Sequence, residues 1–158
     1  MKIKGQATLD ELDWKILGML EENARLTYTE IGNKLNVAHS TVYDRIKRME
    51  EQGIIKKYEA VVDPEKIGLQ QITAYMTITA DPKETDNIAN KLADFSEVLE
   101  VSTSFSEELV IVTKVVAHDQ TQLHSFIAKS IAPLPGVLKI RTAIVTKKYK
   151  EERFQPIL

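Results

Sequence analysis

The chain has 158 residues, of which 43% are hydrophobic and 28% are charged, and it contains no cysteine. This composition is typical of a soluble globular protein with one or two small domains, and it excludes disulfides, thiol catalysis and cysteine-based metal sites. The formal net charge is -2, so composition alone does not indicate a nucleic-acid partner. The sequence has neither a run of 18 apolar residues nor an apolar signal region after Met1, and we therefore expect no membrane span and no secretion.

Three helices are predicted in the first third of the chain, over Leu9 to Glu22, from Thr27 onward, and over about Ala38 to Gln52. Thr27 and Glu30 fit a capping box, in which each side chain satisfies a backbone N–H group at the other position. The inward-facing apolar positions of the third helix are Val42, Ile46 and Met49. Three short helices, the last two joined by a tight turn, predict a helix-turn-helix unit.

A linker is predicted from Asp63-Pro64 to Gly68, because proline disfavours helix before it and glycine permits a turn. Beyond it the predicted strands are Ile72 to Ile78, Val98 to Phe105, Leu109 to Val116 and Val137 to Val145, and the predicted helices are Thr85 to Phe95 and Gln120 to Ile131. The order strand-helix-strand-strand-helix-strand indicates a ferredoxin-like sheet with helices on one face. The other face needs a cover, and self-association through the first and third strands is the simplest one.

We therefore predict an α+β protein, with an N-terminal winged-type helix-turn-helix domain followed by a ferredoxin-like βαββαβ domain. The expected boundaries are 1–62 for the helix-turn-helix domain, 63–70 for a hinge linker, 71–150 for an oligomerisation and effector domain, and 151–158 for a C-terminal tail. Residues 1–58 carry 10 basic and 9 acidic side chains, so the only positive excess, a single charge, lies in this part of the chain.

A series of motifs in this order resembles the Lrp/AsnC family, the feast/famine transcription regulators of bacteria and archaea. The motifs are Leu9-Asp10-x-x-Asp13-x-x-Ile16-Leu17-x-x-Leu20, Asn23-Ala24-Arg25, Thr41-Val42-x-x-Arg45-Ile46-x-x-Met49-Glu50-x-x-Gly53-Ile54-Ile55, Asp63-Pro64 with Gly68, and Pro135-Gly136-Val137 with Thr142. The resemblance is strong over residues 9–68 and weaker after Gln70. It implies a cytoplasmic, sequence-specific DNA-binding transcription regulator without a cofactor. It also implies dimers on palindromic double-stranded DNA, assembly of dimers into octamers, and an amino acid or related metabolite as effector.

The resemblance and the helical spacing together indicate which side chains face DNA. The polar face opposite the inward stripe of the third helix is expected to place its N-terminal residues against base edges in the major groove. The candidates on this face are His39, Ser40, Tyr43 and Asp44 for base contact, with Lys47 beside them and Thr41 and Arg45 at its borders. The candidates for phosphate contact are Arg45, Arg48, Lys56 and Lys57, and also Thr27, Tyr28 and Thr29 at the start of the second helix. Periodicity alone would equally fit an ordinary solvated helix face.

By position, Ser104, Ser106, Glu107 and Thr142 are candidates for polar contact with an effector. The family often has a Gly-x-x-Asp element between the second and third strands, where this chain has Ser104-Phe105-Ser106-Glu107-Glu108. It also often has Thr-x-Thr in the last strand, where this chain has Ile140-Arg141-Thr142, and it often has a capping Ser at the position of Ala38. The identity of the effector stays open.

Two other functions remain as alternatives. Some proteins with the same two-domain plan are siroheme decarboxylases, which use histidine in the second domain, and this chain has His118 and His124 there. A stand-alone amino-acid-binding module is the other, although the intact segment from Arg45 to Gly53 disfavours it. We predict no catalytic residues and no metal ligands, since the sequence has no nucleotide-binding motif and no spacing that favours a catalytic set.

Overall fold

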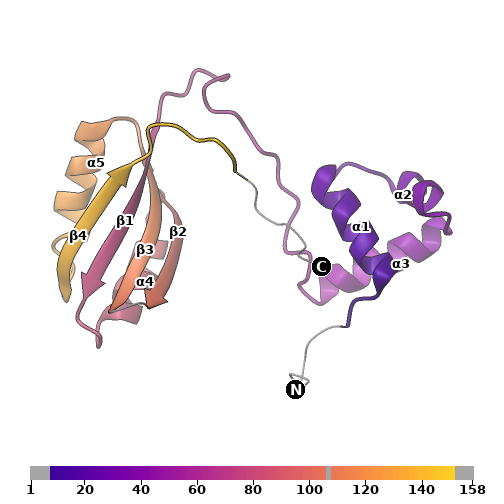
Figure 1. Cartoon of the computed structure of the whole chain (residues 1–158), viewed down its shortest axis with the longest axis horizontal. Coiled ribbons are helices and arrows are strands. Elements are labelled where there is room, and N and C mark those ends of the chain that lie inside the picture. The colour runs from indigo at the N-terminus through magenta and orange to yellow at the C-terminus, as the bar shows by residue number, and fades with distance from the viewer. Residues whose placement is uncertain (1–7, 106–107, 152–158) are drawn as a thin grey trace. The chain divides into compact units, whose positions relative to one another are not determined.

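The computed structural model describes residues 8–105 and 108–151. These residues form two compact units, one ending at Val62 and the other running from Asp63 to Glu151. The first unit is helical, and the second contains a sheet with helices (Figure 1). None of the described helices is long and apolar enough to cross a membrane.

The first unit consists of α1 (Glu11–Glu22), α2 (Tyr28–Leu35) and α3 (His39–Glu51). The capping box of Thr27 and Glu30 is present at the start of α2, as predicted. The α1 helix begins two residues later than predicted, because Asp10 is extended and forms a second capping box with Asp13. No strand forms between Gln52 and Gln71, so within these residues no β-hairpin wing follows α3.

The three helices surround a small apolar core. Its buried members are Ile16, Ile31, Val42, Ile46 and Met49, which confirms the inward stripe predicted for α3. The turn from α2 to α3 is tight. Asn36 takes a left-handed backbone with a φ of 56°, and a Cβ placed on Gly32 would lie 2.7 Å from the carbonyl oxygen of Val37. Close approach of the backbone therefore requires glycine at position 32.

The second unit confirms the predicted βαββαβ order. Its elements are β1 (Ile72–Ala80), α4 (Thr85–Ala93), β2 (Val98–Phe105), β3 (Leu109–Ala117), α5 (Gln120–Phe126), a π-helical turn (Ile127–Ile131) and β4 (Val137–Ile144). The strands form one antiparallel sheet in the order β2-β3-β1-β4. Figure 1 shows α4 and α5 on the same side of this sheet.

The strand residues facing the helices form the core of the second unit. Met76 and Ile78 of β1 and Ile111 and Val115 of β3 are fully buried. The helices contribute Ile88, Leu92, Leu123 and Phe126 to the same cluster. Alternation along each strand therefore separates a buried face from a face without helices, as the sequence predicted.

The sheet face without helices is called the open face below. From the two central strands it presents Thr73, Tyr75, Thr77 and Thr79 of β1 and Val110, Val112, Lys114 and Val116 of β3. Most of these side chains are half-buried, and Tyr75 is exposed. The open face has three valines on its central strand β3, which makes it suited to covering by another surface.

Candidate nucleic-acid interface

The outer face of α3 contains the side chains predicted to meet DNA. His39, Ser40, Tyr43, Asp44, Lys47 and Arg48 are exposed, whereas Thr41 and Arg45 are half-buried. Because Val42, Ile46 and Met49 lie in the core on the opposite side of the helix, this outer face points away from the core of the unit. The first residues of α3 are thus free to contact a ligand outside the unit.

An aromatic pair connects the start of α2 to the outer face of α3. The rings of Tyr28 and Tyr43 meet edge to face, with centroids 5.4 Å apart and an angle of 74° between the rings. The Nζ atom of Lys47 lies 5.8 Å from the centroid of the Tyr43 ring. These contacts restrict the Tyr43 side chain, which favours its use as a defined contact point over free motion in solvent.

Arg45 and Arg48 have partners within the unit, which the sequence did not reveal. The Nη1 atom of Arg45 donates to Asp10 and, over 3.0 Å, to Oδ1 of Asp13. The Nη2 atom of Arg48 donates to Oδ2 of Asp13 over 2.6 Å. The hydrogen bond from Arg45, together with the backbone N–H of Asp13, lowers the pKa of Asp10 to about 2. Both arginines, predicted as phosphate contacts, are therefore ion-paired to α1.

The N-terminus of α2 is capped by the side chain of Glu30, a residue of the same helix. Oε2 of Glu30 accepts hydrogen bonds from the backbone N–H of Thr27 over 2.7 Å and from its hydroxyl over 2.8 Å. The bond from the Thr27 N–H lowers the pKa of Glu30. Of the three residues predicted to receive a phosphate here, Tyr28 and Thr29 are exposed, while Thr27 is already engaged by a carboxylate.

The start of α3 has no side-chain cap. Ala38 occupies the N-cap position with φ -62° and ψ 141°, and no side chain among the described residues caps the first N–H groups of the helix. Neither Asn36 nor Ser40 substitutes for the missing cap, so no described side chain satisfies the donors in the first turn of α3.

Ala38→Ser is expected to stabilise the first unit by about 1 kcal/mol, because the backbone already has the extended conformation that a capping serine uses. The measurement is urea denaturation followed by the helical circular dichroism signal. Ala60→Ser, in the irregular exposed segment after α3, is the control and should leave the midpoint unchanged. Equal midpoints for Ala38→Ser and the parent protein would refute the capping argument.

The segment after α3 is attached to that helix through Tyr58. Its hydroxyl donates to Oε1 of Glu50 over 2.7 Å, and burial, followed by this hydrogen bond, raises the pKa of Tyr58. The predicted phosphate contacts Lys56 and Lys57 precede it. Both are exposed, and Lys57 forms a 3.1 Å ion pair with Glu59. The sequence did not predict the hydrogen bond from Tyr58 to Glu50, because a tyrosine outside any predicted helix or strand belongs to no periodic pattern.

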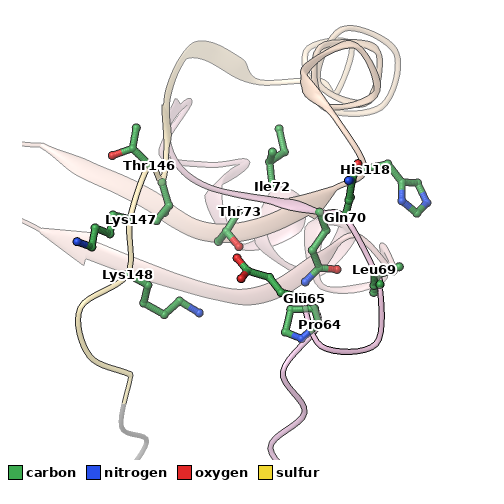
Figure 2. A pocket seen from close by; sticks show the side chains of 13 residues that line it. Pro64, Glu65, Leu69, Gln70, Ile72, Thr73, His118, Thr146, Lys147 and Lys148 are labelled. Carbon is green, nitrogen blue, oxygen red and sulfur yellow. The ribbon is translucent and has the colours of Figure 1, made fainter.

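A hollow of about 850 Å³ lies on the second unit, between residues 64–73 and 145–148. Figure 2 shows side chains from both segments around it, with Glu65 and Lys148 among them and His118 at one side. The charged side chains lining this hollow are Glu65, Lys147 and Lys148. Among residues 8–105 and 108–151, no group of three or more histidines and carboxylates could hold a metal ion.

Two family models match the chain. Residues 9–56 match a winged helix-turn-helix DNA-binding domain, and residues 73–154 match the Lrp/AsnC ligand-binding domain. The chain belongs to the Lrp/AsnC family of transcriptional regulators. Among its curated relatives, the HTH-type transcriptional regulator FL11 of Pyrococcus horikoshii is 32% identical, over 94% of this chain and 97% of the relative. Ptr1 of Methanocaldococcus jannaschii is 31% identical, over 94% and 99%.

Solved structures show the same two-part plan as this Lrp/AsnC protein. Escherichia coli AsnC superposes with a TM-score of 0.85 at 24% identity, covering 95% of this chain and all of that one. A transcriptional regulator from Neisseria meningitidis, solved as a complex with L-Met, superposes with a TM-score of 0.84 at 26% identity, covering 95% and 97%. The predicted family is therefore confirmed, and so is the predicted fold of a helix-turn-helix unit followed by a βαββαβ unit, although no wing strand forms between Gln52 and Gln71.

The predicted effector residues of this Lrp/AsnC chain do not form one site within it. Ser104 lies on β2 and Thr142 on β4, which are the two edge strands of the sheet. Ser104 pairs with Val110 on the open face, whereas Thr142 pairs with the buried Met76 on the helix side. Two strands separate them, which corresponds to about 14 Å. Ser106 and Glu107 lie outside the described residues.

On the open face, the charge of Lys114 is balanced by the C-terminal segment. Its Nζ atom lies 2.5 Å from Oε1 of Glu151, and Lys148 also pairs with Glu151. These two lysines, Lys114 first, lower the pKa of Glu151 to about 2, and Glu151 in turn raises the pKa of Lys114. A lone ammonium on the open face would oppose its burial, and the pairing removes that obstacle.

Lys114→Met is expected to raise the pKa of Glu151 from about 2 toward its ordinary value of 4.5. In the parent protein the attachment of the segment should persist as the pH falls below 4.5 and weaken only near pH 2, because the lowered pKa keeps Glu151 charged over that window. Carboxyl carbon shifts followed by NMR would measure both titrations. Lys129→Met, at an exposed lysine of the π-helical turn, should not move the Glu151 titration, and an unmoved titration in Lys114→Met would contradict the pairing.

Proposed function

We propose that this chain is a sequence-specific DNA-binding transcription regulator that acts as a dimer. The observation that carries the proposal is the exposed face of α3, oriented by the core and beginning with His39 and Ser40. A recognition helix contacts base edges with its N-terminal residues. We assign base contact to His39, Ser40, Tyr43 and Asp44, and phosphate contact to Lys47, Lys56 and Lys57.

The dimer is proposed to form through the open face. One small helical unit makes few contacts with DNA, and two copies separated by one helical turn would bind a palindromic site. Val110, Val112 and Val116 supply the apolar surface for such pairing, and Glu151 neutralises Lys114 beside them. Assembly of dimers into octamers is a further step that the family resemblance favours.

Modulation by an amino acid or related metabolite is part of the proposal. The match of residues 73–154 to a ligand-binding domain supports it, and so does the structural neighbour bound to L-Met. Since Ser104 and Thr142 lie on opposite edges and faces, an effector that contacts both needs more than one protomer. We propose a cytoplasmic location, where archaeal and bacterial relatives have their chromosome.

The curated relatives named above are regulators, which favours regulation over the siroheme decarboxylase alternative. His118 and His124 support this ordering. His118 lines the hollow of the second unit, whereas His124 is exposed on α5 and does not line it. The hollow therefore does not bring His118 and His124 together in one site.

The test is selection of bound sites from random duplex DNA, with affinity measured at two salt concentrations. We expect a short palindrome and strong salt dependence. Tyr43→Ala should change the selected sequence more than the overall affinity, because its ring is positioned by Tyr28. Weak binding without any selected sequence would contradict the proposed function, and unchanged selection by Tyr43→Ala would remove Tyr43 from the base contacts.

A further inference from the structure

The carboxylate of Asp13 is the centre of a charge cluster between α1 and α3. The side chain is 1% exposed, and both of its oxygens are used. Oδ1 accepts from Arg45, and Oδ2 accepts from Arg48 and, over 3.1 Å, from the backbone N–H of Asp10. A buried carboxylate with this set of donors is satisfied only while both arginines stay in place.

The two arginines differ in how far they are committed to this cluster. Arg45 bridges Asp10 and Asp13 through Nη1, and its side chain is 25% exposed. Arg48 uses one nitrogen on Asp13, and its side chain is 43% exposed. Two positive and two negative charges cancel within the cluster. Attraction to a phosphate backbone depends on uncompensated cationic charge, so this part of α3 contributes little of it.

We propose that Asp13 is a positioning residue for DNA recognition. It holds Arg45 and Arg48 as internal counterions, withdraws them from the phosphate backbone, and fixes the angle at which α3 presents its first residues. The proposal rests on the DNA-binding function proposed above. Asp13 lies behind the contact surface, yet it would contribute to the preference of the protein for one DNA sequence. The lysines would then make the phosphate contacts.

The physical reason is geometric. The apolar stripe holds α3 against the core, but apolar contact is non-directional and restricts rotation about the helix axis less than hydrogen bonds of defined geometry do. The arginines emerge from α3 on the side facing α1, and their bonds to Asp13 oppose such a rotation. Loss of the carboxylate would release two cations and allow the exposed face of α3 to turn.

The first experiment compares Asp13→Asn with the parent full-length protein on the selected palindrome and on random DNA. We expect a loss of roughly tenfold or more in affinity for the palindrome, with affinity for random DNA retained or increased. The slope of log affinity against log salt should become steeper by about one unit, because a released arginine reaches a phosphate. Glu21→Gln removes one negative charge at an exposed position of α1. It should change neither the ratio of the affinities for the palindrome and for random DNA nor the slope of log affinity against log salt.

The second experiment keeps the proposal testable if Asp13→Asn does not fold. Arg48→Met should leave the salt slope unchanged while reducing preference for the palindrome, and Arg48→Lys should restore that preference, since one nitrogen suffices for the bond to Asp13. A slope that falls by about one unit in Arg48→Met would overturn the proposal and make Arg48 a phosphate contact. Failure of the parent protein to select any sequence would instead contradict the proposed function.

Discussion

Val112→Asp is expected to convert the protein to a monomer and to lower its affinity for a palindromic site by about 10²–10⁴-fold. Val112 lies on the open face, between Thr77 of β1 and Ser102 of β2 in register. A carboxylate there would be buried against the second copy, and the nearby Lys114 is already paired with Glu151, so the cost is about 3–5 kcal/mol. Loss of pairing removes the second recognition helix, and with it the gain from binding two half-sites at once.

Analytical ultracentrifugation would measure the oligomeric state of the variant. Its affinity would be measured on two duplexes, one with a single half-site and one with both half-sites. The control is Thr103→Asp, at an exposed position of the neighbouring strand that pairs with Ile111 and so faces the other side of the sheet. It should remain dimeric with unchanged affinity. A dimeric Val112→Asp protein would show that the copies pair through another surface.

Gly32→Ala is expected to destabilise the first unit by about 2–3 kcal/mol, enough to unfold a large fraction of so small a unit. The added methyl group would lie 2.7 Å from the carbonyl oxygen of Val37 and 3.4 Å from the backbone nitrogen of His39. Both are backbone atoms of the turn, which cannot yield by a side-chain rotation. DNA binding should fall with the folded fraction.

Gly18→Ala provides a matched control with the opposite sign. Gly18 lies inside α1, and apart from the adjoining helix backbone no atom of the described residues lies within 4 Å of an added Cβ, so alanine should stabilise the helix by up to about 1 kcal/mol. Thermal unfolding of both variants, followed by circular dichroism, compares the same substitution at a closed and an open position. Equal shifts in the two melting curves would rule out the steric explanation.

The sheet and its order of elements could be predicted because β1 and β3 each have one covered face. A strand with one covered face alternates apolar and polar residues, as Met76 and Ile78 alternate with Thr77 and Thr79 in β1. The end of α5 could not be predicted from the sequence. The sequence predicted one helix to Ile131, but the last turn is π-helical, and Ala132 N–H donates to the carbonyl of Ile127 over 2.8 Å. Apolar spacing over five residues does not distinguish the two.

The exposed face of α3 could be predicted for the same reason, since three buried residues define its opposite side. The ion pairs could not. Asp13 and Arg48 are 35 residues apart, and a carboxylate in the first turn of a helix is already explained by the helix dipole. Only the packing of α1 on α3 shows that Asp13 is buried and that both arginines donate hydrogen bonds to it.

The second unit has its entry and its exit side by side. The backbone N–H of Val145, just after β4, donates to the carbonyl of Thr73 at the start of β1 over 2.8 Å. A short peptide could therefore join these two points, and new ends could be opened in a surface turn without disturbing the sheet. The same neighbourhood makes this βαββαβ unit a module that can be inserted into a loop of another protein, with both connections leaving from one place.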